Sequence, residues 1–242
     1  LNDWDNITSL WARRLHAQGV TPKDMVQIAF AYTLFIVGFT STEGVMKTGA
    51  IVIPTGSGAV TPSERQLQIA HDWGVTVFGC TGSYMLHLAD VARKMGFDPI
   101  KDFKIHASFH TAEPLTEEMR VDIERLWGCK AYNNYGSVET GAPTFECEHQ
   151  DGLHISEDAY MFEVINSASG MPVTDGEEGE LAVTTLFKEA APLIRYRIGD
   201  ITAFIKGECS CGRTFKRMGS IRGRVDDMIK VKGVAIYPTD FE

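Results

Sequence analysis

The sequence lacks a long apolar segment, an excess of basic residues and a targeting signal. Its longest apolar run, IAFAYTLFIVGF, contains Tyr and Thr and has about twelve residues, whereas a membrane-spanning helix needs roughly twenty. The 23 basic residues are outnumbered by 32 acidic ones, and this net charge of −9 disfavours non-specific binding to nucleic acid or anionic membranes. The first residues, LNDWDNITSLWARR, show neither an apolar signal-peptide core nor a cleavage site. We therefore expect a cytoplasmic protein without nucleic-acid or membrane partners.

Cysteine is also scarce, with five residues. Cys80 and Cys129 stand in apolar surroundings, which predicts reduced thiols in the core. Internal repeats and low-complexity stretches are missing as well. Four of the seven histidines lie on predicted helices or strands without a paired carboxylate motif, and we assign no role to His16, His71, His87 and His106.

Apolar residues, which make up 44% of the chain, are numerous enough for a packed core, and helical and strand patterns alternate in the first half. Buried strands are predicted at 25–34, 49–56, 74–82, 104–110 and 130–136, and helices at 8–18, 39–49, 61–74, 83–96 and 115–128. This alternation predicts an α/β fold with a mostly parallel sheet flanked by helices. From about residue 152, short alternating strands with Gly, Asp and Ser turns predict a smaller antiparallel β subdomain or barrel.

Three stretches in this framework carry chemistry. NNYGSVETG joins an aromatic ring, a glycine and a carboxylate, which suits purine stacking and a hard cation, although such loops are usually only turns. LIRYRIGDIT ends a strand at Asp200, where a carboxylate can accept both hydroxyls of a ribose or form a surface salt bridge. GRVDDMIKVKGVAIYP predicts a short strand between Gly223 and Gly233. The stretch is either a strand between two mobile points or a plain β-hairpin.

The order and spacing of these three stretches together resemble the ATP-dependent adenylate-forming superfamily of acyl-CoA synthetases and adenylation domains. GAIVIPTGSG, CTGSYMLHLAD, TAEPLTEEMR and GLHISED further resemble the phenylacetate-CoA ligase family, and the resemblance covers the chain nearly end to end. It implies that an aromatic acid is joined to AMP with release of pyrophosphate and then transferred to coenzyme A. Transfer to a carrier protein and a non-catalytic nucleotide-binding, zinc-stabilised module are the alternatives.

The resemblance also implies roles for individual residues around ATP or AMP. Glu139 would ligate Mg²⁺, Tyr135 would lie against adenine, Asp200 would hold the ribose and Asp226 would be the hinge residue. The remaining nucleotide-binding residues would be Ala112, Glu113, Pro114, Asn134, Gly136 and Arg224.

For the acid, the resemblance points to Phe30 and Phe35 as ring walls beside Tyr135 and Gly136. Many relatives have Tyr where this chain has Phe30, and loss of that hydroxyl favours an apolar aromatic acid; plain core packing of both rings is the alternative. On the coenzyme A side we place Tyr84 and Gly233. Gly82 stands where proline is common, which predicts a looser loop.

Two family elements are expected outside this sequence. The phosphate loop should precede Leu1, and the lysine that supports adenylation should follow Glu242, so the resemblance implies a fragment that is nearly inactive alone. It divides the chain into an α/β part at 1–151, a β-rich subdomain of the same large domain at 152–222, and a hinge with the start of the missing C-terminal domain at 223–242. Relatives are often dimers, so a homodimer is possible.

One departure from the family concerns phosphate binding. Val138 replaces the usual Ser or Thr before the motif carboxylate and cannot bond a phosphate oxygen. Either Ser137 or Thr140 substitutes for it, or the contact is absent.

A second group of residues has metal-ligand chemistry. CSCGR places Cys209 and Cys211 on a tight turn, and Cys147 with His154 would complete a tetrahedral site, for which zinc is the natural ion. His149 competes with His154 as the fourth ligand. Four protein ligands leave no open position, so the site would be structural; three reduced surface thiols beside a solvated histidine are the alternative.

Overall fold

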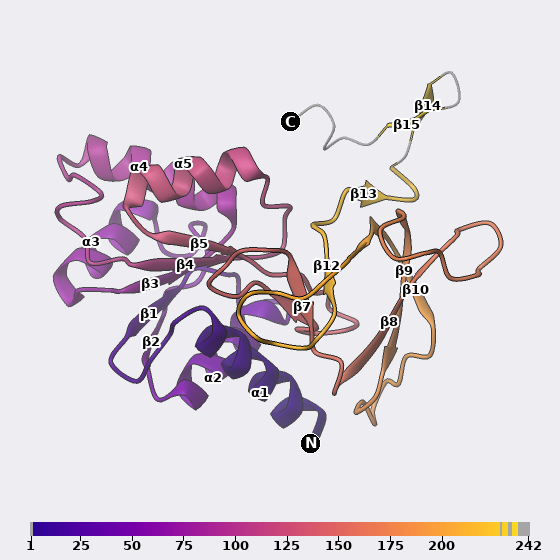
Figure 1. Cartoon of the computed structure of the whole chain (residues 1–242). Helices are drawn as coiled ribbons and strands as arrows, with labels where there is room; N and C mark the ends of the chain where they lie inside the picture. The colour runs from indigo at the N-terminus through magenta and orange to yellow at the C-terminus, as the bar shows by residue number, and fades with distance from the viewer. Residues whose placement is uncertain (1, 228, 232–233, 237–242) are drawn as a thin grey trace.

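The computed structural model describes residues 2–227, 229–231 and 234–236. It places a parallel sheet between two layers of helices in the first half of the chain, with antiparallel sheets beside it in the second half (Figure 1). Among the described residues, no helix combines the length and the apolar character needed to cross a bilayer.

The parallel sheet has five strands in the order β2-β1-β3-β4-β5. Their bounds are Met25–Ile28 (β1), Ile51–Pro54 (β2), Val77–Gly79 (β3), Ala107–His110 (β4) and Lys130–Asn133 (β5). The helices are Asn2–Ala17 (α1), Val37–Thr48 (α2), Ser63–Trp73 (α3), Gly82–Lys94 (α4) and Glu117–Trp127 (α5). Helices α1 and α2 cover one face and α3, α4 and α5 the other, which confirms the predicted fold class.

The central strands β1, β3 and β4 are buried on both faces because adjacent side chains point to opposite helix layers. Val77 packs with Trp11 and Leu15 of α1, whereas its neighbour Phe78 packs with the residues of α3 and α4. Both strand residues have almost no solvent exposure. Consecutive residues of a central strand are therefore buried, including the polar Gln27 and Ser108, instead of alternating between buried and exposed.

Antiparallel strands form two four-stranded sheets and a hairpin, as the second half of the sequence predicts. One sheet has the order β11-β12-β7-β6, with bounds Phe204–Ile205, Arg217–Met218, Leu153–Ile155 and Thr144–Phe145. The other has the order β13-β10-β9-β8, with bounds Gly223–Arg224, Tyr196–Thr202, Gly179–Thr185 and Tyr160–Ile165. The hairpin joins β14 (Ile229–Val231) to β15 (Val234–Ile236).

The first predicted strand is too long. Strand β1 ends at Ile28 rather than at residue 34, and the segment after it leaves the sheet, so that the side chain of Leu34 is 95% exposed. An apolar run cannot by itself reveal where a strand stops, because burial against a sheet and burial around a cavity select the same side chains.

Two of the four histidines to which no role was assigned lie beside a carboxylate that no sequence motif pairs with them. His106 Nε2 lies 2.8 Å from Asp24 Oδ1, and His71 Nδ1 lies 3.0 Å from Asp72 Oδ1. Burial acts to raise the pKa of Asp24, but the bonds from His106, Thr21 and Thr76 lower it to about 2. Asp24 and His106 are remote in sequence and meet only because β1 and β4 lie in one sheet.

Candidate active site

Two adjoining cavities open at the carboxyl ends of the parallel strands. The larger, of about 710 Å³, includes residues that follow β1, β3, β4 and β5; the smaller, of about 400 Å³, lies between β4, β5 and the antiparallel strands β10 and β13. Thr111, Ala112 and Gly136 line both and form a shared wall. Strand order reverses between β1 and β3, and ligands of open α/β sheets bind at such a reversal.

The smaller cavity, called the nucleotide cavity below, collects all eight residues predicted to bind ATP or AMP. They come from three segments, one after β4, one after β5 and one across β10 and β13: Ala112, Glu113, Pro114, Asn134, Tyr135, Gly136, Asp200 and Arg224. Segments up to about 110 residues apart in sequence therefore converge at one edge of the sheet.

Asp200 is held at the centre of a hydrogen-bonded group in this cavity. Its Oδ2 accepts from Tyr135 Oη at 2.6 Å and its Oδ1 from Arg224 Nη1 at 2.9 Å. Arg224 Nε also donates to Asp226 Oδ1, the predicted hinge residue, at 3.2 Å. Burial raises the pKa of the Asp200 carboxyl despite the neighbouring Arg224 guanidinium, and burial also raises the pKa of Tyr135.

A bulge in β10 sets the position of Asp200. The register between β10 and β9 shifts between Arg197 and Ile201. Within this bulge Gly199 has a φ of 87°, a backbone conformation that residues other than glycine rarely adopt. Asp200 is thereby paired with Arg224 across β10 and β13. The glycine before the motif aspartate thus has a backbone function.

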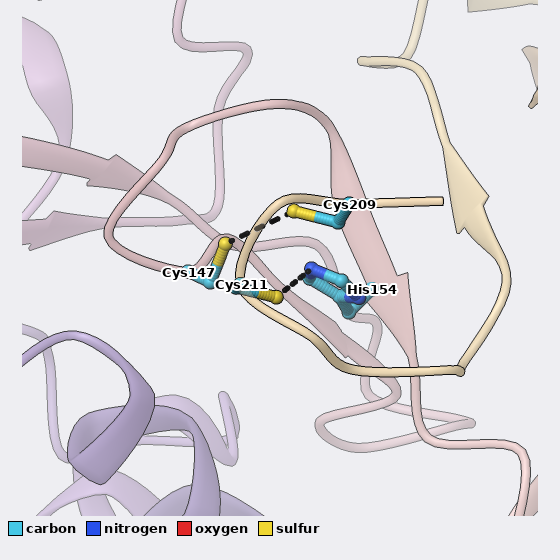
Figure 2. Close-up of side chains that lie close together, drawn as sticks. All are labelled: Cys147, His154, Cys209 and Cys211. Carbon is cyan, nitrogen blue, oxygen red and sulfur yellow. Dashed lines mark hydrogen bonds between the residues drawn. The ribbon is translucent and has the colours of Figure 1, made fainter. Parts of the chain in front are cut away.

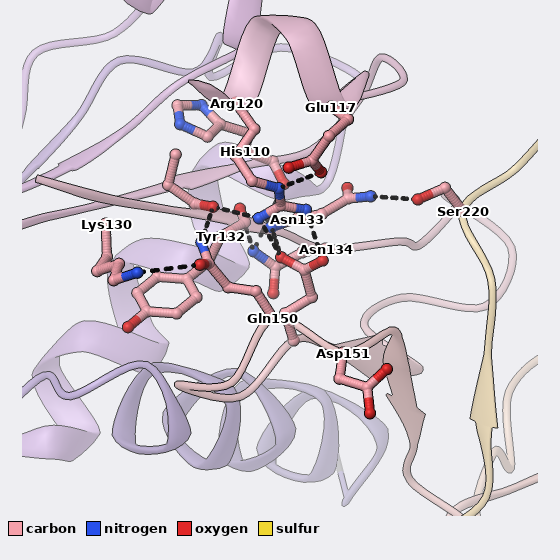
Figure 3. A network of polar contacts seen from close by, with 12 residues as sticks. His110, Glu117, Arg120, Lys130, Tyr132, Asn133, Asn134, Gln150, Asp151 and Ser220 are labelled. Atoms are coloured by element: carbon pink, nitrogen blue, oxygen red, sulfur yellow. Dashed lines mark hydrogen bonds and ion pairs between the residues drawn. The ribbon is translucent and has the colours of Figure 1, made fainter. Parts of the chain in front are cut away.

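A buried polar network supports the end of β5 beside the cavity (Figure 3). Arg120 Nη1 and Nη2 donate to the two carboxylate oxygens of Glu146 at 2.9 and 2.7 Å, and Glu146 Oε2 accepts from the Asn133 backbone N–H at 2.6 Å. Asn133 Nδ2 then donates to Ser220 Oγ at 3.3 Å, which joins the parallel sheet to the segment before β13. Sequence reasoning missed this network because its partners belong to separate elements.

The larger cavity, called the acid cavity below, is lined by the predicted ring walls Phe30 and Phe35 and by Tyr84. Phe30 is buried and packs near Phe109, with ring centroids 6.2 Å apart, whereas Phe35 is 61% exposed. Tyr84 Oη lies 3.0 Å from Ser63 Oγ. Gly82 is buried at the start of α4, and Gly233, the second residue predicted to lie on the coenzyme A side, is outside the described residues.

The residues around Val138 have separate positions. Val138 and Ser137 line the acid cavity, whereas Thr140 is completely buried and bonded to Ser137 Oγ at 3.0 Å. Of the two alternatives to the missing hydroxyl, only Ser137 therefore borders a cavity. Glu139 is exposed, and its backbone carbonyl oxygen accepts a hydrogen bond from Lys188 Nζ. In the described part of the chain, Glu139 lines neither of the two cavities.

Glu113 links the walls of the two cavities. Its Oε1 accepts from the Ser83 backbone N–H at 2.6 Å and its Oε2 from Ser83 Oγ at 3.0 Å. A carboxylate at this point caps the amino-terminal end of α4, whose own cap residue Thr81 makes no side-chain cap bond. Glu113 therefore holds the helix that carries Tyr84 against the segment that borders the nucleotide cavity.

Replacing Glu113 with alanine is expected to lower the free energy of unfolding by about 1 kcal/mol, because the helix cap is lost. If the acid cavity binds the acid predicted from the sequence, KM for that acid should also rise severalfold, since the α4 wall would shift. Denaturant unfolding and steady-state kinetics of the full-length protein test both effects. Glu118→Ala, at an exposed acid on α5, is the matched control, and equal effects of the two changes would contradict the capping role.

His110 is a buried histidine that sequence reasoning overlooked. It ends β4, its Nδ1 lies 3.1 Å from the Cys80 carbonyl oxygen and its Nε2 2.9 Å from Ser108 Oγ. Its own carbonyl accepts from the Asn134 backbone N–H at 2.9 Å, so it braces the chain just before Thr111. Burial lowers the pKa of His110 to about 4, so its imidazole is neutral at neutral pH.

The protein should lose stability on acidification as His110 becomes protonated. The unfolded chain binds this proton near pH 6.5 and the folded one only near pH 4, so the folded state loses up to about 3 kcal/mol as pH falls through that window. Unfolding free energies measured between pH 4 and 7 should depend less on pH in His110→Asn. The control is His16→Asn, at an exposed position, and identical profiles for both variants would refute the assignment.

A cluster of three cysteines and one histidine lies apart from both cavities, in the sheet of β6, β7, β11 and β12. Figure 2 shows Cys147, His154, Cys209 and Cys211 converging, and their ligand atoms all lie within 4.8 Å of one another. Cys147 and Cys209 sulfurs are 3.7 Å apart, and Cys211 Sγ is 3.5 Å from His154 Nε2. His149 is exposed and outside the cluster, so the geometry favours His154 over its competitor.

The cluster geometry fits tetrahedral coordination. With Zn–S near 2.3 Å and Zn–N near 2.0 Å, ligand atoms around one ion are separated by roughly 3.5 to 3.8 Å. Two of the six separations in the cluster, 3.7 Å between Cys147 and Cys209 and 3.5 Å between Cys211 and His154, have these values, and all six are within 4.8 Å. Three of the four residues are buried, and Cys147 and Cys209 are thus not the surface thiols of the alternative interpretation.

Comparison with known proteins gives consistent matches. The family described as AMP-binding enzyme matches residues 4–186. The whole chain is 40% identical over 245 residues to a phenylacetate-coenzyme A ligase of Escherichia coli, and 39% identical over 244 residues to one of Thermus thermophilus. It covers 54% of each, so the chain spans about half the length of these curated relatives.

A solved structure agrees with the described fold. The crystal structure of a 2-hydroxyisobutyryl-CoA ligase in the postadenylation state superposes with a TM-score of 0.93 and 31% sequence identity, covering 98% of this chain and 51% of that one. The matched family, the identity to the ligases and the shared fold all lead to one assignment. The chain belongs to the AMP-binding enzyme family and is similar over its whole length to phenylacetate-coenzyme A ligases.

Proposed function

We propose that the full-length protein activates an aromatic carboxylic acid as its acyl-adenylate and transfers the acyl group to coenzyme A. The observation that carries this proposal is the pair of cavities that meet at Thr111, Ala112 and Gly136. One is lined by aromatic rings and the other by an aspartate and an arginine. The carboxylate of an acid in the first cavity and the phosphate of a nucleotide in the second would come together beside the residues that the two cavities share. Adenylation requires this proximity of the two reacting groups.

In this proposal, the nucleotide cavity orients AMP through Asp200 and Arg224. The ribose hydroxyls would donate to Asp200 in place of Tyr135, whose ring would then turn its face to adenine. Arg224 would bring positive charge to the phosphate. Mg²⁺, when bound, would neutralise phosphate charge in the displacement, and Glu139 is its proposed ligand.

The names of the relatives support an aromatic acid as the substrate and coenzyme A as the thiol acceptor. The curated relatives are phenylacetate-coenzyme A ligases, and Phe30 closes the acid cavity without the hydroxyl of a tyrosine. We therefore propose a phenylacetate-like acid as the substrate and coenzyme A, rather than a carrier protein, as the acceptor. Tyr84, with Gly233, is proposed to face the thiol partner.

Pyrophosphate release by the full-length protein tests the proposal. The assay contains ATP, Mg²⁺ and one of phenylacetate, benzoate or indoleacetate, each with and without coenzyme A. Acid-dependent release that coenzyme A stimulates is the expected result. Acid-dependent release that coenzyme A does not stimulate would favour transfer to a carrier protein, and AMP binding without release from any acid would identify a non-catalytic module.

We also propose that Cys147, His154, Cys209 and Cys211 bind one structural zinc ion. The donor set and the separations of the ligand atoms support zinc, and four protein ligands leave no position for a substrate. Metal analysis of the purified protein should find one zinc per chain. Less than about 0.1 zinc per chain after purification in zinc-supplemented medium would refute the site.

A further inference from the structure

Arg14 is a buried cation that lines the acid cavity. Arg14 lies on α1 and is only 1% exposed. Its guanidinium carbon is 4.1 Å from the centre of the Trp11 ring. Its Nη2 donates to the Thr144 carbonyl oxygen at 2.8 Å and approaches the Tyr135 carbonyl oxygen at 3.5 Å. The sequence carried a signal for it, because Arg14 interrupts the apolar face formed by Leu10, Trp11 and Leu15.

Arg14 has no carboxylate partner within the described residues, and both of its acceptors are backbone carbonyls. Its Nε is buried without any hydrogen-bond partner there. A guanidinium carries five N–H donors, and burying a charge with unpaired donors is costly. Burial lowers the pKa of Arg14 only to about 9, so the group remains a cation at neutral pH.

The surroundings indicate what the cation faces. The acid cavity that Arg14 lines is also lined by Trp11, Phe30, Ile36 and Val37, which offer no charge, and by polar residues such as Thr40, His87 and Ser137; none of its described lining residues is a carboxylate. Arg14 does not line the nucleotide cavity. The inference rests on the proposed function, in which the reacting carboxylate points at the shared wall with the nucleotide. An acceptor for Arg14 must therefore lie on another part of the acid.

We infer that Arg14 determines specificity by binding an oxygen acceptor on the body of the acid, apart from the reacting carboxylate. The substrate class is then an aryl acid with a ring hydroxyl, carbonyl or second carboxylate. An acid without such an oxygen leaves the buried donors unpaired and binds the transition state less tightly, which is how polar sites reject apolar analogues. This inference keeps the aryl acid of the proposed function but replaces the apolar ring expected from Phe30 with a ring that carries an oxygen acceptor.

The experiment compares acids of equal size in the full-length protein. Values of kcat/KM from pyrophosphate release are measured for 3- and 4-hydroxyphenylacetate against 3- and 4-methylphenylacetate, and for 1,4-phenylenediacetate against 4-isobutylphenylacetate. The hydroxyl-methyl pairs test a neutral oxygen acceptor, and the last pair tests an anionic acceptor, the second carboxylate. We expect the wild type to prefer at least one oxygen-bearing acid over its apolar partner by about tenfold or more.

Two variants assign that preference to Arg14. In Arg14→Met the ratio should fall to about 1, because kcat/KM falls more for the oxygen-bearing acid than for its methyl-substituted partner, and in Arg14→Lys the ratio should be intermediate because the charge is kept without the planar fork. A wild type without any preference overturns the inference, as does a preference that survives in Arg14→Met. Equal losses with both acids in both variants would show a purely structural brace of the Tyr135 and Thr144 carbonyls.

Folding and activity controls keep the outcomes separate. If circular dichroism shows that Arg14→Met is unfolded, Arg14→Lys decides, and an unchanged ratio there overturns the inference. Absence of pyrophosphate release with every acid overturns the proposed function itself, and this inference with it. Release with apolar and oxygen-bearing acids alike supports the proposed function while overturning the role of Arg14.

Discussion

Replacing Gly136 with alanine is expected to reduce acid-dependent pyrophosphate release by about 100-fold, because a displacement near 1 Å at a reacting centre has effects of this size. A Cβ atom at Gly136 would lie 2.2 Å from the Gly141 carbonyl oxygen, which is a backbone atom. The two segments are held together by the Gly141 N–H, which donates to the Ser137 carbonyl oxygen at 2.7 Å. The added methyl must therefore move the wall that both cavities share.

Gly219→Ala is the matched control for this change. A Cβ at Gly219 would meet its nearest atom, the Ala203 carbonyl oxygen, at 3.8 Å, which is ordinary contact. Both variants should have similar circular dichroism, and only Gly136→Ala should lose activity in the full-length protein. Equal activity of the two variants would show that the shared wall does not position the reacting groups.

Removal of zinc is expected to lower the midpoint of thermal unfolding by about 10 °C, which corresponds to roughly 4 kcal/mol for a chain of this size. The four proposed ligands come from the segment after β6, from β7 and from the loop between β11 and β12, so the ion would tie together segments up to about 64 residues apart. These short strands have few backbone bonds of their own. Scanning calorimetry before and after chelation, and after zinc is added back, measures the effect.

Two Cys→Ser variants distinguish the effect of losing zinc on thermal unfolding from the effect of losing a thiol. Cys209→Ser should lose most of the bound zinc and show the lowered midpoint without chelator, because serine is a poor zinc ligand. Cys129→Ser makes the same chemical change at a buried cysteine beside Ser108, outside the cluster, and should keep one zinc per chain. Equal zinc content in both variants would exclude Cys209 as a ligand.

Local sequence determined the layers of this fold. The helix over 8–18 was predicted from Ile7, Leu10, Trp11 and Leu15, and the structure has α1 at Asn2–Ala17 with these residues buried. The alternation of helices and strands predicted a parallel sheet, and the turn-rich strands after residue 152 predicted antiparallel pairing. Such patterns succeed because burial repeats with the period of the element, which is a property of neighbouring residues.

Eight of the residues that line the nucleotide cavity were also predictable, from motifs whose order and spacing resemble a known family. Their partnerships were not. The bond of Tyr135 to Asp200, the cap that Glu113 places on α4 and the choice of His154 over His149 each join residues that are distant in sequence or equivalent in composition. The roles of these residues stay predictions until the experiments above are done.

What the sequence by itself determined is the fold class, the family and the set of polar residues that gather at the strand ends. Only the tertiary structure decided where β1 stops, that Asp24 pairs with His106, and that Arg14 is buried beside the acid cavity without a carboxylate. The physical reason is that side-chain periodicity depends on near neighbours, whereas charge pairing and cavities depend on which strand ends meet in space.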